Sequence, residues 1–149
     1  MSVEIRQLAP HDAAILDHVA PDVFDAPVDP RRTAAYLAEP GHIILVAIAG
    51  GIVIAQVASV NHRHPDKPTE LYIDEVGVTP AWQRQGIAQR MLDRMFAIGA
   101  AMGCAEAWVG TETDNQPARR LYESRGGTTA EPFVMYVYKL QSESSTSDR

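Results

Sequence analysis

The 149-residue chain contains a single cysteine, Cys104. One thiol excludes an intrachain disulfide and any zinc site built from several thiolates, and it fits a protein of the reducing cytoplasm. Basic residues are also scarce, since 13 Lys and Arg stand against 19 Asp and Glu for a formal net charge of -6. Nucleic-acid binding needs a basic face, so this composition argues against a nucleic-acid partner and favours a cationic ligand.

The sequence also lacks a recognisable targeting segment. Residues Met1–Arg6 include an early acid and no apolar core typical of a secretory signal. The apolar stretch Ile43–Val60 is about as long as a membrane span, but Gly50-Gly51 lies at its centre between runs rich in Val and Ile. This pattern predicts a β-hairpin, because a two-residue hairpin turn needs the positive φ that glycine supplies. We therefore expect a cytoplasmic protein without a membrane partner.

Strand and helix patterns alternate along the rest of the chain. We expect strands at residues 3–8, 69–79, 105–110 and 133–140, the third of a buried type, and helices at residues 10–19, 31–37, 85–102 and 115–126. This order predicts one α/β domain over residues 1–140 with at least one parallel β–α–β unit. The Ser-rich residues 141–149 are expected to form a disordered C-terminal tail.

The most informative segment is Glu75–Ala88, where a strand runs into a turn and the turn opens a helix. Its Q-x-x-G-x-A pattern would place free backbone N–H groups at a helix N-terminus, which suits a diphosphate, and Gly86 has no Cβ to keep phosphates away. Three polar side chains can add donors: Gln83, Arg84 and Gln85. The same short pattern also fits a helix cap with a chance glycine. Neither G-x-x-x-x-G-K-[ST] nor G-x-G-x-x-G occurs, which excludes a P-loop and gives a dinucleotide-binding fold no support.

A second motif follows at Asn115–Gly126, with the pattern N-x-x-A-x-x-L-Y-x-x-x-G. The two motifs together span about half of the chain, and their order and spacing resemble the GNAT superfamily of N-acetyltransferases. The resemblance implies a mixed central sheet of about six to seven strands with a splayed parallel pair, flanked by about four helices.

The resemblance also implies acetyl-CoA as co-substrate, with its pantetheine arm between the strands at residues 69–79 and 105–110. The arm would pair with the backbone of Val76 and Val78 as an added strand does. The pyrophosphate would lie on the loop formed by Gln83, Arg84, Gln85, Gly86, Ile87 and Ala88. Three residues of the second motif would face the other side of the arm: Asn115, Ala118 and Tyr122.

Catalytic roles follow from the same resemblance. The Val76 N–H would stabilise an oxyanion, and Tyr122 would protonate the leaving thiolate, although an aromatic residue on a helix can also serve packing alone. Glu75 or Asp74 would remove a proton from the amine, and we favour Glu75. Because strand side chains alternate, the two acids should point to opposite faces. Either acid could instead be a solvated charge at a sheet edge, but two acids inside a central strand are costly unless they serve a cleft.

A closer resemblance, to the aminoglycoside 3-N-acetyltransferases of the same superfamily, rests on Val23–Asp25, Tyr36-Leu37 and Glu70–Val76. It implies a cationic aminosugar as substrate. Four carboxylates are candidates for binding it: Asp25, Glu75, Glu112 and Asp114. A protein or peptide N-terminus, a polyamine, or a non-catalytic acyl-CoA-binding module are the alternatives.

A metal is not expected. His62 and His64 form an H-x-H pair, but they lie in a loop rich in proline and charge, and the sequence shows no third ligand near them. The chain could form a homodimer, because edge strands in such sheets often pair.

Overall fold

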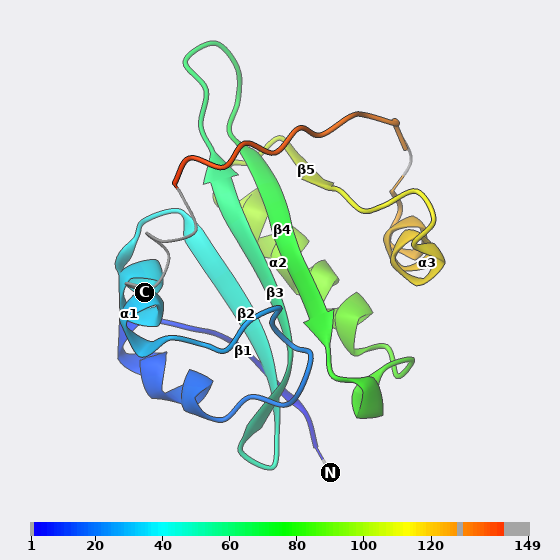
Figure 1. Ribbon diagram of the computed structural model, residues 1–149. Helices are drawn as coiled ribbons and strands as arrows, with labels where there is room; N and C mark the ends of the chain where they lie inside the picture. Colours follow the sequence, from blue (N-terminus) through cyan, green and yellow to red (C-terminus); the bar gives the residue numbers. More distant parts are fainter. Residues whose placement is uncertain (1, 128–129, 142–149) are drawn as a thin grey trace.

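The computed structural model describes residues 2–127 and 130–141, which form a five-stranded sheet in the order β1-β2-β3-β4-β5 (Figure 1). Strands β1 to β4 are antiparallel, and β5 pairs with β4 in parallel. In chain order the elements are β1 (Glu4–Gln7), the 3-10 helix η1 (Pro10–Asp17), α1 (Pro30–Ala38), β2 (His42–Ala49), β3 (Ile52–His62), β4 (Glu70–Val78), the 3-10 helix η2 (Pro80–Trp82), α2 (Ile87–Ala101), β5 (Glu106–Val109) and α3 (Gln116–Ser124).

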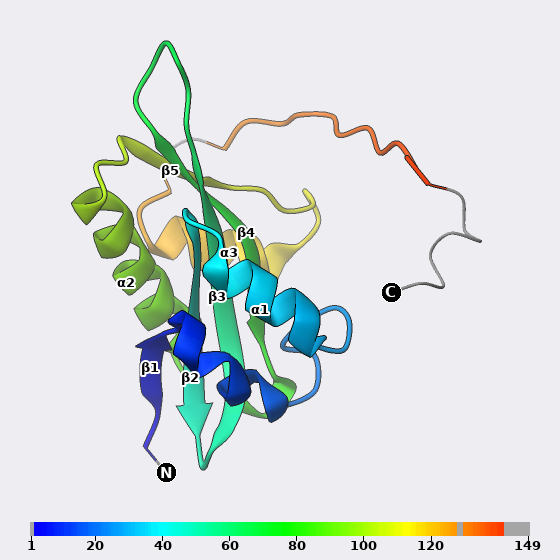
Figure 2. The ribbon, with the colours of Figure 1, turned by 90° about the vertical axis from the view of Figure 1, so that its left-hand side faces the viewer.

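The predicted hairpin is present as β2 and β3, joined at Gly50 and Gly51 with φ values of 58° and 77°. Its strands are largely apolar because helices cover both faces of the sheet, with α2 on one side and η1 and α1 on the other (Figure 2). Alternate β2 residues serve the two sides: Leu45 packs in the cluster with α2, and Val46 packs in the cluster with η1.

Strands β4 and β5 separate halfway along β4. The parallel ladder joins Glu70–Ile73 to Glu106–Val109 and ends there, whereas the pairing of β4 with β3 continues to Val78. The splayed parallel pair that the sequence predicts is therefore confirmed. From Asp74 to Val78 the side of β4 that faces away from β3 has no strand beside it in the described part of the chain, so its backbone is open to a ligand.

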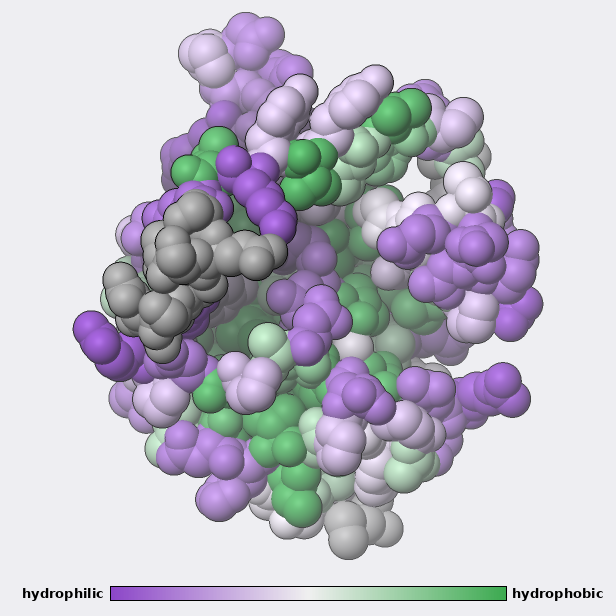
Figure 3. Space-filling model, in the orientation of Figure 1, coloured by the Kyte–Doolittle hydropathy of each residue, from purple (hydrophilic) through white to green (hydrophobic). Residues whose placement is uncertain are grey.

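The predicted sheet of six to seven strands is wrong for the described residues, which contain five strands. Residues 130–141, here named the C-terminal arm, form no ladder, although the apolar run Phe133–Leu140 predicted a strand. The six consecutive side chains of residues 133–138 are between 63% and 84% exposed, and Leu140 is 92% exposed. Figure 2 shows the arm leading away from the sheet, and in Figure 3 some of its side chains appear as hydrophobic spots at the surface.

The predicted buried character of the strand at residues 105–110 is also wrong, because the arm does not pair with β5 as a further strand. Three of the four β5 residues are exposed, and Trp108 is 44% exposed even though its ring stacks on Tyr72. A strand takes its hydrogen bonds and side-chain cover from its neighbours, and β5 has a neighbour on one side only. Two other expectations need qualification: the segment at residues 10–19 is a 3-10 helix, and residues 142–149 of the predicted tail lie outside the described residues.

Within the described residues, the longest helix is α2, and neither it nor any other helix has the length and apolar character needed to cross a bilayer.

Candidate active site

Asp74 and Glu75 lie at a β-bulge in β4, next to the point where β5 separates from it. The ladder pairs Ile73 and Glu75 with consecutive residues of β3, so Asp74 between them has no partner. A bulge re-aims side chains that strict alternation would send to opposite faces. Both carboxylates lie close enough to Tyr36 to raise the pKa of its hydroxyl. The predicted alternation is therefore broken at this pair of acids.

Glu75 is held by Gln56, a polar residue of β3 that is only 1% exposed. The Gln56 Nε2 donates to Glu75 Oε1 at 2.8 Å and to the carbonyl oxygen of Val23 at 3.2 Å. Partial burial raises the pKa of the Glu75 carboxyl, the Gln56 hydrogen bond lowers it, and the charges of Asp74 and Asp25 raise it again. The net effect is a carboxyl whose pKa lies above its usual value, which makes its carboxylate a stronger proton acceptor than an unperturbed one.

Tyr36 of α1 and His42 of β2 border the same acidic group. The Tyr36 hydroxyl donates to the carbonyl oxygen of Ile43 at 3.1 Å, and its ring centroid lies 5.0 Å from that of His42. Burial, followed by the charges of Asp74 and Glu75, raises the pKa of Tyr36, so its hydroxyl stays protonated. Burial also raises the pKa of Asp74, while a backbone hydrogen bond and His42 lower it.

The loop that carries Asp25 can approach β4 because position 77 is glycine. A Cβ added to Gly77 would lie 2.2 Å from the carbonyl oxygen of Val23, a distance that no side chain tolerates. Val23 is 2% exposed, and the same carbonyl accepts the hydrogen bond from Gln56. The loop is therefore fixed against the strand, and Asp25 is held near enough to Glu75 to raise its pKa.

The turn from β4 to α2 has a backbone suited to binding an anion. Arg84 and Gly86 both have positive φ, 63° and 78°, and Gly86 is the N-cap of α2. Because Gly86 has no side chain, the first N–H groups of the helix are not capped from that position and lie at the positive end of the helix dipole. The nearest atom to an added Cβ would be 3.8 Å away, so the turn needs this glycine for its φ value and not for space.

Two glutamines of this turn brace it from within. The Gln83 side-chain amide donates to the Val78 carbonyl at 3.0 Å, and that of Gln85 donates to the Ala81 carbonyl at 3.3 Å. Both were predicted to add donors for a phosphate. In this structure one N–H of each amide is used inside the turn, which leaves the second N–H of each, the first helix N–H groups and the exposed Arg84 side chain as donors for a phosphate.

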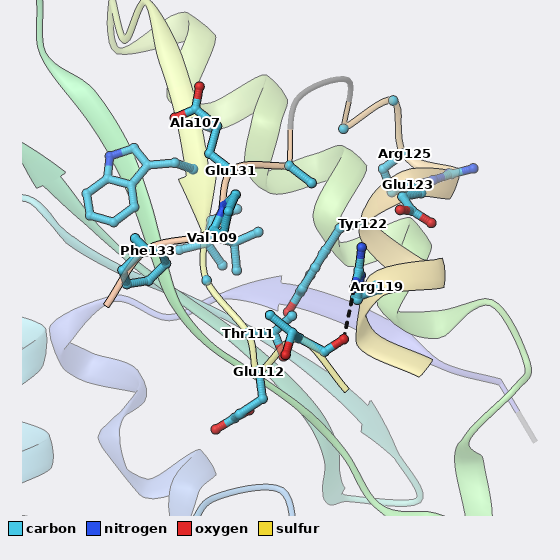
Figure 4. A pocket seen from close by; sticks show the side chains of 18 of the residues that line it. Ala107, Val109, Thr111, Glu112, Arg119, Tyr122, Glu123, Arg125, Glu131 and Phe133 are labelled. Atoms are coloured by element: carbon cyan, nitrogen blue, oxygen red, sulfur yellow. Dashed lines mark hydrogen bonds between the residues drawn. The ribbon is translucent and has the colours of Figure 1, made fainter. Parts of the chain in front are cut away.

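Tyr122 of α3 borders a cavity of about 560 Å³ between β5, α3 and the start of the C-terminal arm (Figure 4). Burial raises the pKa of the Tyr122 hydroxyl, and its ring packs against the main core cluster. The hydroxyl therefore keeps its proton at neutral pH and can donate it. Arg119, which also lines the cavity, donates to the Thr113 carbonyl at 2.8 Å and holds the preceding loop.

Side-chain contacts at both ends of α3 fix the position of Tyr122. At the N-terminus Asn115 Oδ1 accepts a hydrogen bond from the Ala118 N–H at 3.2 Å, so Asn115 caps the helix as expected. At the C-terminus Arg125 pairs with Asp93 of α2 at 2.8 Å. The two motifs of the sequence are thus joined through contacts between α2 and α3.

The four predicted substrate carboxylates fall into two groups. Asp25 raises the pKa of Glu75, as Asp74 does, so Asp25 lies close to the two acids of β4. Glu112 lines the cavity that Tyr122 borders, and in Figure 4 its side chain points away from the Tyr122 ring. Asp114 follows in the loop before α3. The charges that act on Glu75 do not include Glu112 or Asp114.

Three residues of the acidic site were not proposed from the sequence: Tyr36, His42 and Gln56. Gln56 carried a signal, because a single amide within an apolar strand is costly to bury unless it has partners. Tyr36 entered the sequence analysis only as part of a resemblance and His42 not at all, since only the folded chain brings α1 and β2 next to the bulge in β4.

Residues 12–127 of the chain match the acetyltransferase (GNAT) family. Among curated proteins, the N-alpha-acetyltransferase RimI of Mycobacterium tuberculosis is 31% identical over 106 residues, which cover 70% of this chain and 63% of the relative. An aminoglycoside N(6′)-acetyltransferase type 1 of Salmonella typhimurium is 22% identical over 95 residues, covering 61% of this chain and 66% of the relative. The chain therefore spans less than two thirds of the length of either relative.

Solved structures share the fold. An aminoglycoside acetyltransferase from an uncultured soil metagenomic sample, in complex with sisomicin, has a TM-score of 0.79 at 20% identity and covers 93% of this chain and 97% of its own. A ribosomal-protein-alanine N-acetyltransferase from Brucella melitensis biovar Abortus has a TM-score of 0.71 at 19% identity and covers 93% of this chain and 100% of its own. At such identities the likeness concerns the fold alone.

Proposed function

Because this chain belongs to the acetyltransferase (GNAT) family, we propose that it transfers the acetyl group of acetyl-CoA to a primary amine of a cationic small molecule. The observation that carries the substrate class is the grouping of Asp25, Asp74 and Glu75 beside the open part of β4. Three carboxylates in one place attract and hold a polycation, and an aminoglycoside antibiotic is such a molecule.

The residues present fit acetyl-CoA. Family members use this co-substrate, and the turn at Gln83–Ala88 offers the diphosphate uncapped helix N–H groups and the Arg84 guanidinium. The free side of β4 gives the pantetheine amides a strand edge at Val76 and Val78. Asn115 and Ala118 would border the arm from α3. The reaction needs no metal.

Three groups would carry the chemistry. Glu75, with its raised pKa, would accept the proton of the protonated amine, and Asp74 is the second candidate. The Val76 N–H would donate to the carbonyl oxygen of the thioester as negative charge develops there. Tyr122, protonated at neutral pH, would give its proton to the departing thiolate.

A second candidate substrate is the α-amine of a protein or peptide. The observation that favours it is the 31% identity to N-alpha-acetyltransferase RimI, against 22% for the aminoglycoside enzyme. The clustered acids would then bind a basic residue close to the peptide N-terminus. The Salmonella relative named above is an N(6′) enzyme, so acetylation of the 3-amino group stays a prediction.

The decisive experiment measures thiol release from acetyl-CoA with matched panels of aminoglycosides, polyamines and short peptides. We expect turnover on aminoglycosides, and mass spectrometry and NMR of the product would identify the acetylated amine. Turnover on peptides alone would overturn the small-molecule assignment. Tight binding of acetyl-CoA without turnover on any panel would favour a non-catalytic acyl-CoA-binding module.

A further inference from the structure

A second group of chemically active side chains lies at the far end of β4, where the β3–β4 loop begins and ends. His62 is the last residue of β3, His64 follows in the loop, and Glu70 is the first residue of β4. One ligand atom from each of the three lies within 4.8 Å of the others. His64 Nε2 is 2.6 Å from Glu70 Oε1, and the two imidazole centroids are 4.3 Å apart.

The strand register explains why the three side chains meet. His62 is directly opposite Glu70 in the antiparallel ladder, and cross-strand partners carry their side chains on the same face. His64 lies two residues beyond His62, and the loop turns it back to the first residue of β4. The sequence shows the histidine pair but not the glutamate, because Glu70 reaches the pair only through this register.

Two carboxylates at the group, against the ammonium of Lys67 whose charge also acts on Glu70, favour a cation. Glu70 is also opposite Glu106 in the parallel ladder with β5, so two carboxylates stand side by side on one face. Like charges in such a pair destabilise a sheet, and a cation bound next to them offsets the repulsion. The side chains of His64 and Glu70 are only 14% and 21% exposed, so an ion held between them would be partly shielded from water.

We propose that His62, His64 and Glu70 form a binding site for a divalent transition-metal ion, of which Zn²⁺ is the best match. Two imidazole nitrogens and one carboxylate oxygen are ligands that Zn²⁺ prefers, and water from the open side would complete four-fold coordination. The carboxylate and imidazole that now contact each other would both turn to the ion.

The site stands apart from acetyl transfer. Val76 lies six positions after Glu70 in β4, which corresponds to roughly 20 Å along an extended strand. An ion here would tie the end of β3 to the start of β4 and order the loop at residues 63–69. It would therefore contribute to stability and not to chemistry at the acidic site.

Calorimetric titration with Zn²⁺ tests the proposal. The untagged full chain is first treated with a chelator to remove bound metal, and the chelator is then removed. We expect one equivalent of Zn²⁺ to bind and to raise the thermal unfolding midpoint. Mg²⁺ should do neither, because it prefers oxygen ligands. Glu70→Gln and His62→Ala should each weaken Zn²⁺ binding by roughly tenfold or more, whereas His11→Ala, at an exposed histidine outside the group, should not.

Each other result overturns the assignment. Absence of saturable Zn²⁺ binding removes the site. Binding that survives both Glu70→Gln and His62→Ala places the ion elsewhere, and binding lost only with His62→Ala removes the carboxylate from the site. Glu70→Gln keeps the shape of the side chain, and circular dichroism of each variant checks that the sheet is intact. The readout is binding, so the result does not depend on the proposed enzymatic activity.

Discussion

At the scale of single residues, the environment of Glu75 contains influences of opposite sign on its pKa. Burial raises the pKa, the hydrogen bond from Gln56 lowers it, and the negative charges of Asp74 and Asp25 raise it. Only the ionised carboxylate can accept a proton from the amine. The acidic limb of the pH–rate profile should therefore follow the Glu75 pKa. Removal of each neighbour should move this limb in the direction opposite to the effect of that neighbour on the pKa.

Removing the charge at position 25 should move the acidic limb of kcat/KM to lower pH. In Asp25→Asn the negative charge that raises the Glu75 pKa is gone, so the carboxylate forms at lower pH. The measurement is kcat/KM against pH with a saturating concentration of acetyl-CoA. Asp22→Asn, in the same loop, is the control and should leave the limb in place. If the acidic limb did not move in Asp25→Asn, Asp25 would have no effect on the pKa of the catalytic base.

Removing the hydrogen bond to Glu75 should have the opposite effect. In Gln56→Leu the donor that lowers the Glu75 pKa is replaced by a side chain of similar size, so the acidic limb should move to higher pH. The same pH profile measures it, together with a melting curve to confirm the fold. A shift to lower pH, or none, would show that another group titrates in the profile.

Tyr122→Phe should lower kcat by roughly 10²–10⁴-fold, the usual contribution of a general acid, while the affinity for acetyl-CoA changes little. The ring remains in the core cluster, and only the hydroxyl is lost. Steady-state turnover and calorimetric binding of acetyl-CoA measure the two quantities. Tyr72→Phe is the matched control, since Tyr72 stacks on Trp108. Equal turnover in Tyr122→Phe and the unmodified chain would reduce Tyr122 to a packing role.

At the scale of elements, the close approach of the Val23 loop to β4 depends on one missing side chain. Gly77→Ala should destabilise the fold by about 1–3 kcal/mol, because the new Cβ would overlap the Val23 carbonyl and push the loop away. The loop carries Asp25, so KM for the amine should rise as well. Denaturant unfolding and substrate saturation curves measure the two effects.

The control is Gly51→Ala in the β2–β3 turn. An added Cβ at Gly51 has no atom within 4 Å, so only its positive φ is strained, and the expected cost is roughly 1 kcal/mol. KM should stay unchanged in this variant. If both variants raised KM alike, the effect would come from global stability and not from the loop.

The elements that the sequence predicted well have local causes. The Gly50-Gly51 turn, the apolar face of α2 and the Asn115 cap of α3 are each encoded within a few neighbouring residues. The bulge at Asp74 is different, because it exists only in the pairing register of β4 with β3, which the residues around Asp74 do not encode by themselves. The state of the arm and the exposure of β5 likewise depend on neighbours and not on the residue pattern.

The same distinction holds for the candidate site. The turn at Gln83–Ala88 and the position of Tyr122 follow from motifs with local structure. The interactions that set the Glu75 pKa come from Asp25 in the Val23 loop, from Gln56 of β3 and from the adjacent Asp74, and these segments meet only in the folded sheet. The positions of Tyr36 and His42 at the acidic group were therefore beyond reach of the sequence alone.

At the scale of the whole molecule, the two core clusters cover β2 and β3 on both faces, whereas β5 and the arm stay largely exposed. Buried residues of β2 and β3 pack against α2 on one face and against η1 and α1 on the other. The arm contributes neither a ladder nor a buried side chain. The free energy of unfolding therefore resides almost wholly in residues before the arm.

An extended, uncovered segment rich in aromatic residues is what an endopeptidase with chymotrypsin-like preference cuts first. Phe133 is 63% exposed, and Tyr136 and Tyr138 are each 77% exposed. Brief digestion should clip the arm at these positions and leave a resistant fragment with the melting temperature of the intact chain, as mass spectrometry and calorimetry would show. Early cleavage inside α2 instead would mean that the arm is sheltered in solution. If the arm is cut first, protein preparations that age in the presence of protease would contain two species of different mass and equal stability.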